Sequence, residues 1–146
     1  MLNLMKMTKT DIIYTIPFDP IAWKRPGGGK HGRYDTQAKL KQQYATLVKF
    51  IHGPDLIPLS GPLFLDCTFY VALPIKTKYK PGDYCPKRPD KDNYEKFLLD
   101  ALTGVLYHDD AQIADGRIRK IYALKPSTQF KITPLPQSSL QTSLIY

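Results

Sequence analysis

Apolar residues recur along this chain with two different periods, and each period predicts a different kind of element. Across residues 62–73, "PLFLDCTFYVAL", every second residue is apolar. Such alternation is typical of a strand with one buried face, so this segment predicts a long strand. The same pattern predicts shorter strands at residues 11–17, 116–125 and 130–132.

Two other segments carry apolar residues three and four positions apart, which is the spacing of one helix face. The first helix is predicted to follow Asp35 or Thr36, either of which can cap it, and to stop before Gly53. The second covers residues 92–104 and ends on a glycine. Strands and helices in this order predict an α+β fold, with a small mixed β-sheet packed against two main helices.

A chain of 146 residues, of which 42% are hydrophobic, is long and apolar enough to fold as one domain. We expect this domain to span residues 11–133, between a flexible N-terminus at 1–10 and a loose, uncharged tail at 134–146. No run approaches the ~18 apolar residues of a membrane span, and the first residues lack the apolar core of a signal peptide. With two cysteines that lack metal-ligand spacing, these features predict a cytoplasmic protein.

Charge is distributed unevenly along the chain, whose formal net charge is +8. Residues 90–115 hold seven acidic residues and two lysines, a net charge of −5, whereas the remainder holds 19 basic and six acidic residues, or +13. A basic protein favours an acidic partner, most simply nucleic acid. Crowded acids repel one another unless water, helical spacing or a bound cation compensates.

Basic residues cluster ahead of the first predicted helix, in "WKRPGGGKHGRY" at residues 23–34. Four glycines make this segment either a plain flexible loop or a mobile basic arm, and we favour the arm. Glycine lets the backbone approach a phosphate closely, while lysine and arginine neutralise its charge. With the two basic residues directly before the acidic window, the expected DNA-binding residues are Lys24, Arg25, Lys30, Arg33, Lys87 and Arg88.

The acidic window has a pair of aspartates at the start of the second predicted helix and another pair after it. Asp90 and Asp92 can simply stabilise the N-terminus of the helix with their negative charge, and Asp92 or Asn93 can cap it. One aspartate suffices for that role. About twelve helical residues rise ~18 Å, and five or six extended residues return about the same distance. We therefore expect Asp109 and Asp110 to return beside the first pair if the extended segment runs antiparallel to the helix.

Converging aspartates supply the hard oxygen ligands that Mg²⁺ prefers, and one or two such ions can activate water to hydrolyse a phosphodiester. Lys96 follows Asp92 by four residues, so it can form an ion pair on the helix or place its ammonium against the scissile phosphate. His108 can act as a general base beside Asp109 or can be an incidental turn residue.

"PDKDNYEKFLLDAL" at residues 89–102 and "DDAQIAD" at 109–115 resemble the acidic motifs of the RusA family of phage and prophage Holliday-junction resolvases. The basic segment near the N-terminus looks like the loop that opens the family's domain. This resemblance implies a homodimeric, Mg²⁺-dependent crossover junction endodeoxyribonuclease, with Mn²⁺ as a substitute metal. Such an enzyme cuts four-way DNA junctions symmetrically in recombination and repair, inside a bacterial host or phage-infected cell.

Carried onto this sequence, the resemblance implies catalytic roles for Asp90, Asp92, Lys96 and Asp110, with the three aspartates as metal ligands. Asn93 and Asp109 match the pattern without a definite role. The alternatives are a less selective Mg²⁺ nuclease for flaps or other branches and a non-catalytic protein that binds branched DNA. A phosphohydrolase of small molecules fits the surrounding charge of +13 less well.

Overall fold

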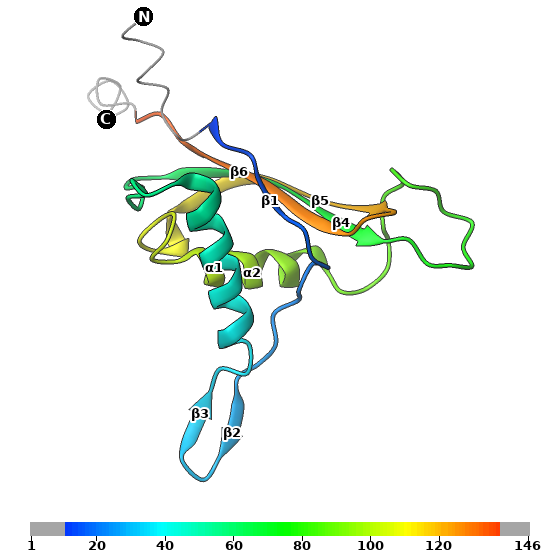
Figure 1. The fold of residues 1–146 in the computed structure, drawn as a ribbon, viewed down its shortest axis with the longest axis horizontal. Helices are drawn as coiled ribbons and strands as arrows, with labels where there is room; N and C mark the ends of the chain where they lie inside the picture. The colour runs from blue at the N-terminus through cyan, green and yellow to red at the C-terminus, as the bar shows by residue number, and fades with distance from the viewer. Residues whose placement is uncertain (1–10, 138–146) are drawn as a thin grey trace, which may run out of the picture.

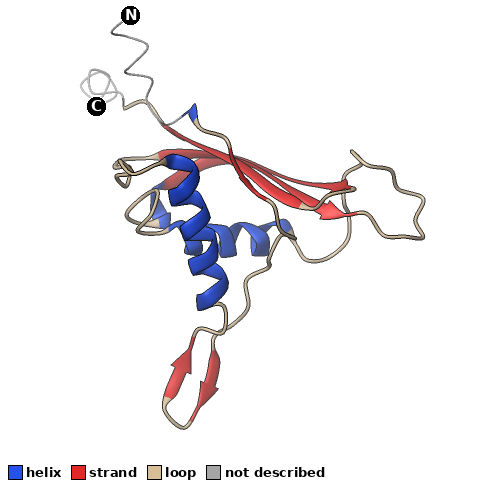
Figure 2. Cartoon of the chain, viewed as in Figure 1, coloured by secondary structure: helices blue, strands red, loops and turns tan. Residues whose placement is uncertain are grey.

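The computed structural model describes residues 11–137, which form a four-stranded sheet, a separate two-stranded hairpin and two α-helices. Both helices lie on the same face of the sheet (Figures 1 and 2). This two-layer arrangement confirms the predicted α+β fold with a mixed sheet and two helices. In chain order the elements are β1 (Tyr14–Ile16), β2 (Gly27–Gly29), β3 (Gly32–Tyr34), α1 (Ala38–His52), β4 (Leu63–Ala72), α2 (Lys91–Leu102), the 3₁₀ turn η2 (Asp110–Gln112), β5 (Ile113–Ala123) and β6 (Ser127–Pro134).

The main sheet has the strand order β1-β6-β4-β5. Strand β6 pairs antiparallel with β1 and β4, whereas β4 and β5 are parallel. Two adjacent parallel strands need a crossover that returns the chain to the edge where the first strand began. Helix α2 is that crossover, so it runs antiparallel to both β4 and β5 (Figure 1).

The core lies between the sheet and the two helices. Every second residue of β4 from Leu63 to Phe69 is buried, as the alternation predicts. The ring of Tyr94, on α2, stacks on Phe69 with a centroid separation of 5.2 Å. Helix α1 packs against α2 through an edge-to-face contact between Tyr44 and Phe97, at 5.1 Å. Aromatic pairs of this kind stabilise a fold by roughly 0.5–1.5 kcal/mol beyond the area that they bury.

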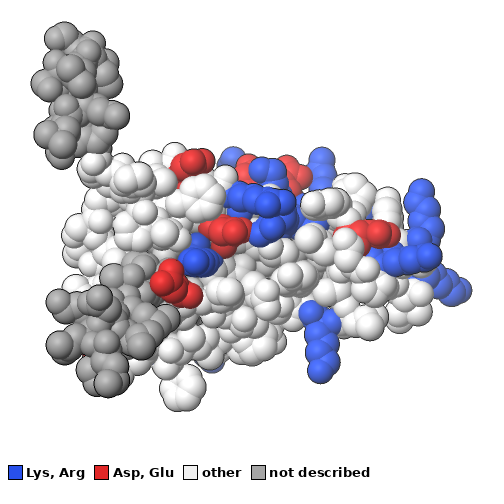
Figure 3. Space-filling view, turned by 90° about the horizontal axis from the view of Figure 1, so that it is seen from above, with Lys and Arg blue, Asp and Glu red and all other residues white. Residues whose placement is uncertain are grey.

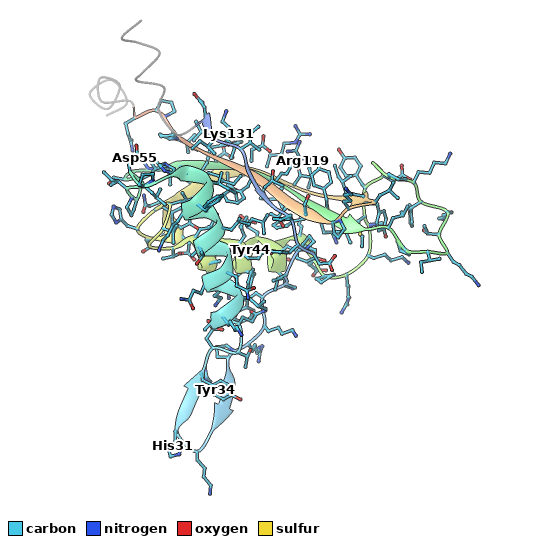
Figure 4. The ribbon with its side chains drawn as sticks, in the orientation of Figure 1. His31, Tyr34, Tyr44, Asp55, Arg119 and Lys131 are labelled. Carbon is cyan, nitrogen blue, oxygen red and sulfur yellow. The ribbon has the colours of Figure 1, made fainter. Side chains whose placement is uncertain are left out.

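The opposite face of the sheet carries charged side chains of both signs. Arg119 of β5 pairs with Asp66 of β4, and Lys131 of β6 lies 3.6 Å from Asp11. Figure 3 looks down on this face and shows acidic and basic side chains interspersed over the sheet. The labelled Arg119 and Lys131 project away from the helices (Figure 4). The alternation along β4 therefore separates a buried face from a solvated one.

The basic glycine segment contains the hairpin of β2 and β3, which projects from the body of the molecule beyond α1 (Figure 1). The expected loop is therefore partly regular. The turn ends at Gly32, whose φ of +100° is a conformation that residues with a side chain rarely adopt. Gly27 faces the ring of Tyr34 so closely that a Cβ there would lie 2.6 Å from it. His31 lies at the far end of the hairpin (Figure 4).

Some predicted boundaries shift. Gln37, rather than Asp35 or Thr36, is the N-cap of α1, and Asp35 instead accepts hydrogen bonds from the Gln37 N–H and from Lys41. The last strand is longer than predicted, because β6 reaches Pro134 at the start of the expected tail. The expectations for residues 1–10 and 138–146 lie outside the described residues. Within residues 11–137, neither helix is long and apolar enough to cross a membrane.

Candidate active site

The D-x-D motif lies at the N-terminal end of α2. Asp90 is the N-cap residue, but its side chain makes no capping hydrogen bond, and Asp92 lies in the first turn. Both side chains are exposed. The prediction that Asp92 or Asn93 caps the helix is therefore wrong, and the Asp90 carboxylate is not used as a cap. The partial positive charge of the helix N-terminus stabilises negative charge at this place.

The chain leading into Asp90 is held by a lysine that the sequence analysis did not single out. The Lys120 ammonium donates hydrogen bonds to the carbonyl oxygens of Pro89, at 2.7 Å, and of Lys87. Lys120 belongs to β5, and it interrupts the alternating apolar residues Ile118 and Tyr122. A lysine at an inward position of a strand was the signal that could have revealed this contact.

Lys96 does not form the ion pair with Asp92 that the i,i+4 spacing allows. Among the described residues, its ammonium instead lies over the Trp23 ring, 3.7 Å from the ring centroid. The backbone N–H of Trp23 donates a hydrogen bond to the backbone carbonyl of Asn93, at 3.0 Å. Lys96 is exposed, so its ammonium remains accessible to a ligand at this end of α2.

The second acidic pair is organised by Gln112. The Gln112 side-chain oxygen accepts hydrogen bonds from the N–H groups of His108 and Asp109, and its nitrogen donates to the carbonyls of Leu59 and Gly61. Asp109 caps η2, because its carboxylate accepts a hydrogen bond from the Ala111 N–H at 2.9 Å. These contacts give Asp109 and the glutamine of the "DDAQ" motif a structural role.

Asp110 follows Asp109 in an acidic environment. Partial burial, a hydrogen bond with Asp109 and the negative charges of Asp100 and Asp109 raise the pKa of the Asp110 carboxyl. Asp100 itself lies 3.8 Å from the ammonium of Lys41. Repulsion of this kind is relieved when a cation binds to the carboxylates.

The predicted convergence of the two acidic pairs is wrong within one chain. No group of three or more His, Cys, Asp or Glu side chains that could hold a metal ion occurs in residues 11–137. Residues 103–109 form a compact turn at the C-terminal end of α2 instead of an extended return, and β5 makes the return after Asp110. Because α2 is a crossover between the parallel strands β4 and β5, one end of α2 lies near the C-terminal end of β4 and the other near the N-terminal end of β5 (Figure 1). Twelve residues of helix separate them by about 18 Å.

Four of the six candidate DNA-binding residues lie in the two segments that meet the D-x-D end of α2, and the other two lie on the projecting hairpin. Lys87 and Arg88 are exposed and directly precede Pro89 and Asp90. Lys30 and Arg33 belong to the hairpin, and Lys24 and Arg25 belong to the loop that leads into it; all four are exposed. This loop contacts the first turn of α2 through Trp23 and Asn93. Basic side chains and two carboxylates therefore share one end of this helix.

The family described as "Endodeoxyribonuclease RusA" matches residues 17–133. The chain belongs to the RusA endodeoxyribonuclease family. It is also 34% identical to the "Uncharacterized protein YqaN" of Bacillus subtilis (strain 168), an alignment that covers 83% of this chain and 94% of that protein. The RusA match includes the arm, both helices and both acidic pairs, so the site described above lies wholly inside the family's domain.

Proposed function

We propose that this RusA family member is a Mg²⁺-dependent, structure-specific endodeoxyribonuclease that resolves Holliday junctions by paired, symmetric cuts. Recombination and repair are the processes that create and need to remove such junctions. The observation that carries the proposal is the D-x-D end of α2, where two exposed carboxylates lie beside Lys96 and a basic arm. An acidic metal site within a basic surface suits hydrolysis of a nucleic-acid backbone.

Asp90 and Asp92 fit a magnesium ion as partial ligands. Their carboxylates are exposed, are not used as helix caps, and come from short side chains two residues apart. Mg²⁺ takes oxygen ligands and usually keeps several waters, so it needs only one or two carboxylates from each chain segment. When bound, such an ion lowers the pKa of its water and neutralises charge that develops on the phosphate. Mn²⁺ has similar preferences and should substitute.

The third aspartate requires a second chain. Asp110 lies about one helix length from Asp90 and Asp92, so we assign it to the site of a partner in a C2 dimer. If the α2 helices of two chains run antiparallel, the C-terminal end of one lies beside the N-terminal end of the other. Twofold symmetry then creates two equivalent sites, as two symmetric cuts require.

The remaining residues would bind and orient the DNA. The arm and the bases preceding Asp90 would hold phosphates, and the Lys96 ammonium would contact the scissile phosphate or the charge that develops on it. Most of the binding free energy would then come from phosphate contacts, which fix the position of the duplex without reading its sequence.

Cleavage of a labelled synthetic four-way junction tests this function, with a linear duplex of the same sequence as control, in Mg²⁺ and in EDTA. We expect paired nicks in the junction alone, and only with metal. Cleavage of both substrates would instead indicate a less selective nuclease. Tight junction binding that persists in EDTA, without cleavage in Mg²⁺ or Mn²⁺, would indicate a non-catalytic branched-DNA-binding protein.

Mixing inactive chains tests whether the site is shared. One variant carries Asp90→Asn and Asp92→Asn, and the other carries Asp110→Asn. Each alone should fail to cut while still binding DNA, because the substitutions remove negative charge that faces phosphate. A mixed dimer contains one wild-type site if the aspartates come from different chains, and none if they come from the same chain. Nicking of one strand by the mixture, at a rate that depends on chain exchange, is therefore expected.

A further inference from the structure

We propose that Trp23 is a positioning residue that holds the Lys96 ammonium in place and fixes the basic arm to the catalytic end of α2. The inference rests on the proposed function, because it deepens the role of Lys96 in that site. The arm comprises residues 23–34, and its first residue, Trp23, is where the loop leading into the hairpin meets α2.

Two contacts join Trp23 to α2. Its backbone N–H donates a hydrogen bond to the backbone carbonyl of Asn93, which belongs to the first helical turn. Its ring lies beneath the Lys96 ammonium at 3.7 Å, a distance at which the negative face of an indole attracts a cation. Trp23 is only partly exposed and packs against the edge of the core, which restricts the motion of its ring.

The N-terminal end of α1 also holds the arm, through the side chain of Gln37. The buried Gln37 amide accepts a hydrogen bond from the Lys24 N–H at 2.9 Å and donates one to the Ala22 carbonyl at 2.8 Å. These bonds lie on either side of Trp23 along the chain. The backbone at Trp23 is therefore fixed by α1 through Gln37 and by α2 through Asn93.

This arrangement has a chemical consequence for Lys96. A free lysine side chain samples many rotamers, and ordering it during the reaction costs conformational entropy. The indole restricts the Lys96 ammonium before DNA arrives, beside the turn that carries Asp92. Preorganised charges stabilise a developing negative charge better than charges that must first be ordered.

Trp23 also fixes the distance between the residues that would bind DNA and the D-x-D motif that would cleave it. A phosphate held by Lys24 or Arg25 lies within one or two residues of the indole that positions Lys96. A duplex bound to the arm is thereby placed at a fixed offset from the D-x-D motif. Loss of the indole should disturb catalysis more than binding, since the basic residues themselves remain.

The test compares Trp23→Leu and Trp23→Phe with wild type in single-turnover cleavage of the four-way junction at saturating protein. Trp23→Leu should reduce the rate by roughly 2- to 30-fold, the range that cation–π strengths allow. The dissociation constant for the junction should change by less than about 2-fold. Trp23→Phe should recover part of the rate because it keeps an aromatic face. Phe50→Leu is the control for loss of an exposed aromatic ring, since Phe50 lies near the C-terminal end of α1, at the opposite end of that helix from the arm.

Two further measurements separate positioning from general damage. In a Lys96→Met background, Trp23→Leu should cause no additional loss of rate, because the two residues act through one contact. NMR of lysine-labelled protein should show ring-current shifts of the Lys96 methylene protons that disappear in Trp23→Leu, independently of activity. A wild-type protein that cuts junctions, paired with a Trp23→Leu variant that cuts at the same rate, would overturn this inference alone. A full Trp23→Leu effect without Lys96 would also overturn it, whereas a wild-type protein that cuts no junction would overturn the proposed function itself.

Discussion

If the arm binds DNA phosphates, removal of its charge must flatten the salt dependence of binding. Among residues 11–137, its four basic side chains are exposed, and none of them forms an ion pair with a carboxylate. Each phosphate contact to duplex DNA contributes about −0.9 to the slope of log K against log salt. The variant to make replaces Lys24, Arg25, Lys30 and Arg33 with alanine.

Four lost contacts would reduce the magnitude of the slope by about 3.6, and two lost contacts by about 1.8. Between about 50 and 200 mM salt, a fourfold change, four contacts account for a loss of affinity of roughly 150-fold. The wild-type protein should show that additional loss and the variant should not. The difference is larger than the uncertainty of an ordinary titration.

Fluorescence anisotropy of a labelled four-way junction, titrated in EDTA at several salt concentrations, measures both slopes without cleavage. The control must lose the same net charge elsewhere, for which we choose alanine at Lys39, Lys49, Lys125 and Lys131. Equal slopes for the arm variant and wild type would refute the assignment of the arm to DNA. Equal reductions in both variants would show that net charge, rather than the arm, governs binding.

Two further predictions concern the fold. Gly116→Ala should lower the free energy of unfolding by about 1–3 kcal/mol, because its Cβ would lie 2.7 Å from the Leu65 carbonyl oxygen. Urea denaturation should reveal no such loss in Gly28→Ala, where a Cβ meets open space. The hydrogen bond from Lys41 is the main cause that lowers the pKa of Asp35. Asp35→Asn should therefore destabilise the protein near neutral pH. The difference from wild type should shrink only as the pH falls below about 4, through the lowered pKa of Asp35, as measured by denaturation at each pH.

Periodicity in the sequence predicts which residues are buried, and here it predicted the elements of the main domain well. The alternation along β4 reports the burial of Leu63, Leu65, Cys67 and Phe69, because a half-buried strand must alternate whatever its neighbours are. The same pattern does not report the direction in which strands pair. The predicted convergence of the acidic pairs failed for this reason. The sequence pattern does not say whether the chain returns along the helix before Asp110 or only along the strand that follows it.

A strand, a helix and a second strand in succession already favour a crossover between parallel strands. Such a crossover places the residues before the helix and those after it at opposite ends of the strands. Asp90 and Asp110 could therefore have been separated from the sequence alone. The contact of Lys96 with Trp23 could not, because it joins residues 73 positions apart and depends on how the arm crosses α2. The hairpin could not be predicted from the sequence pattern for a different reason. Glycine-rich strands such as β2 have no alternation of apolar and polar side chains.

The separation of the acidic pairs has a consequence for the proposed enzyme. The D-x-D end of α2 carries the arm, Lys96 and the bases that would bind DNA, whereas the Asp110 end supplies carboxylates. A single chain could then bind DNA through its arm without possessing a complete metal site. Only a dimer would hold three aspartates together, and a C2 dimer would hold them twice. Cleavage would thus be restricted to an assembly that can cut both strands of a junction, because the geometry that completes one site completes its partner as well.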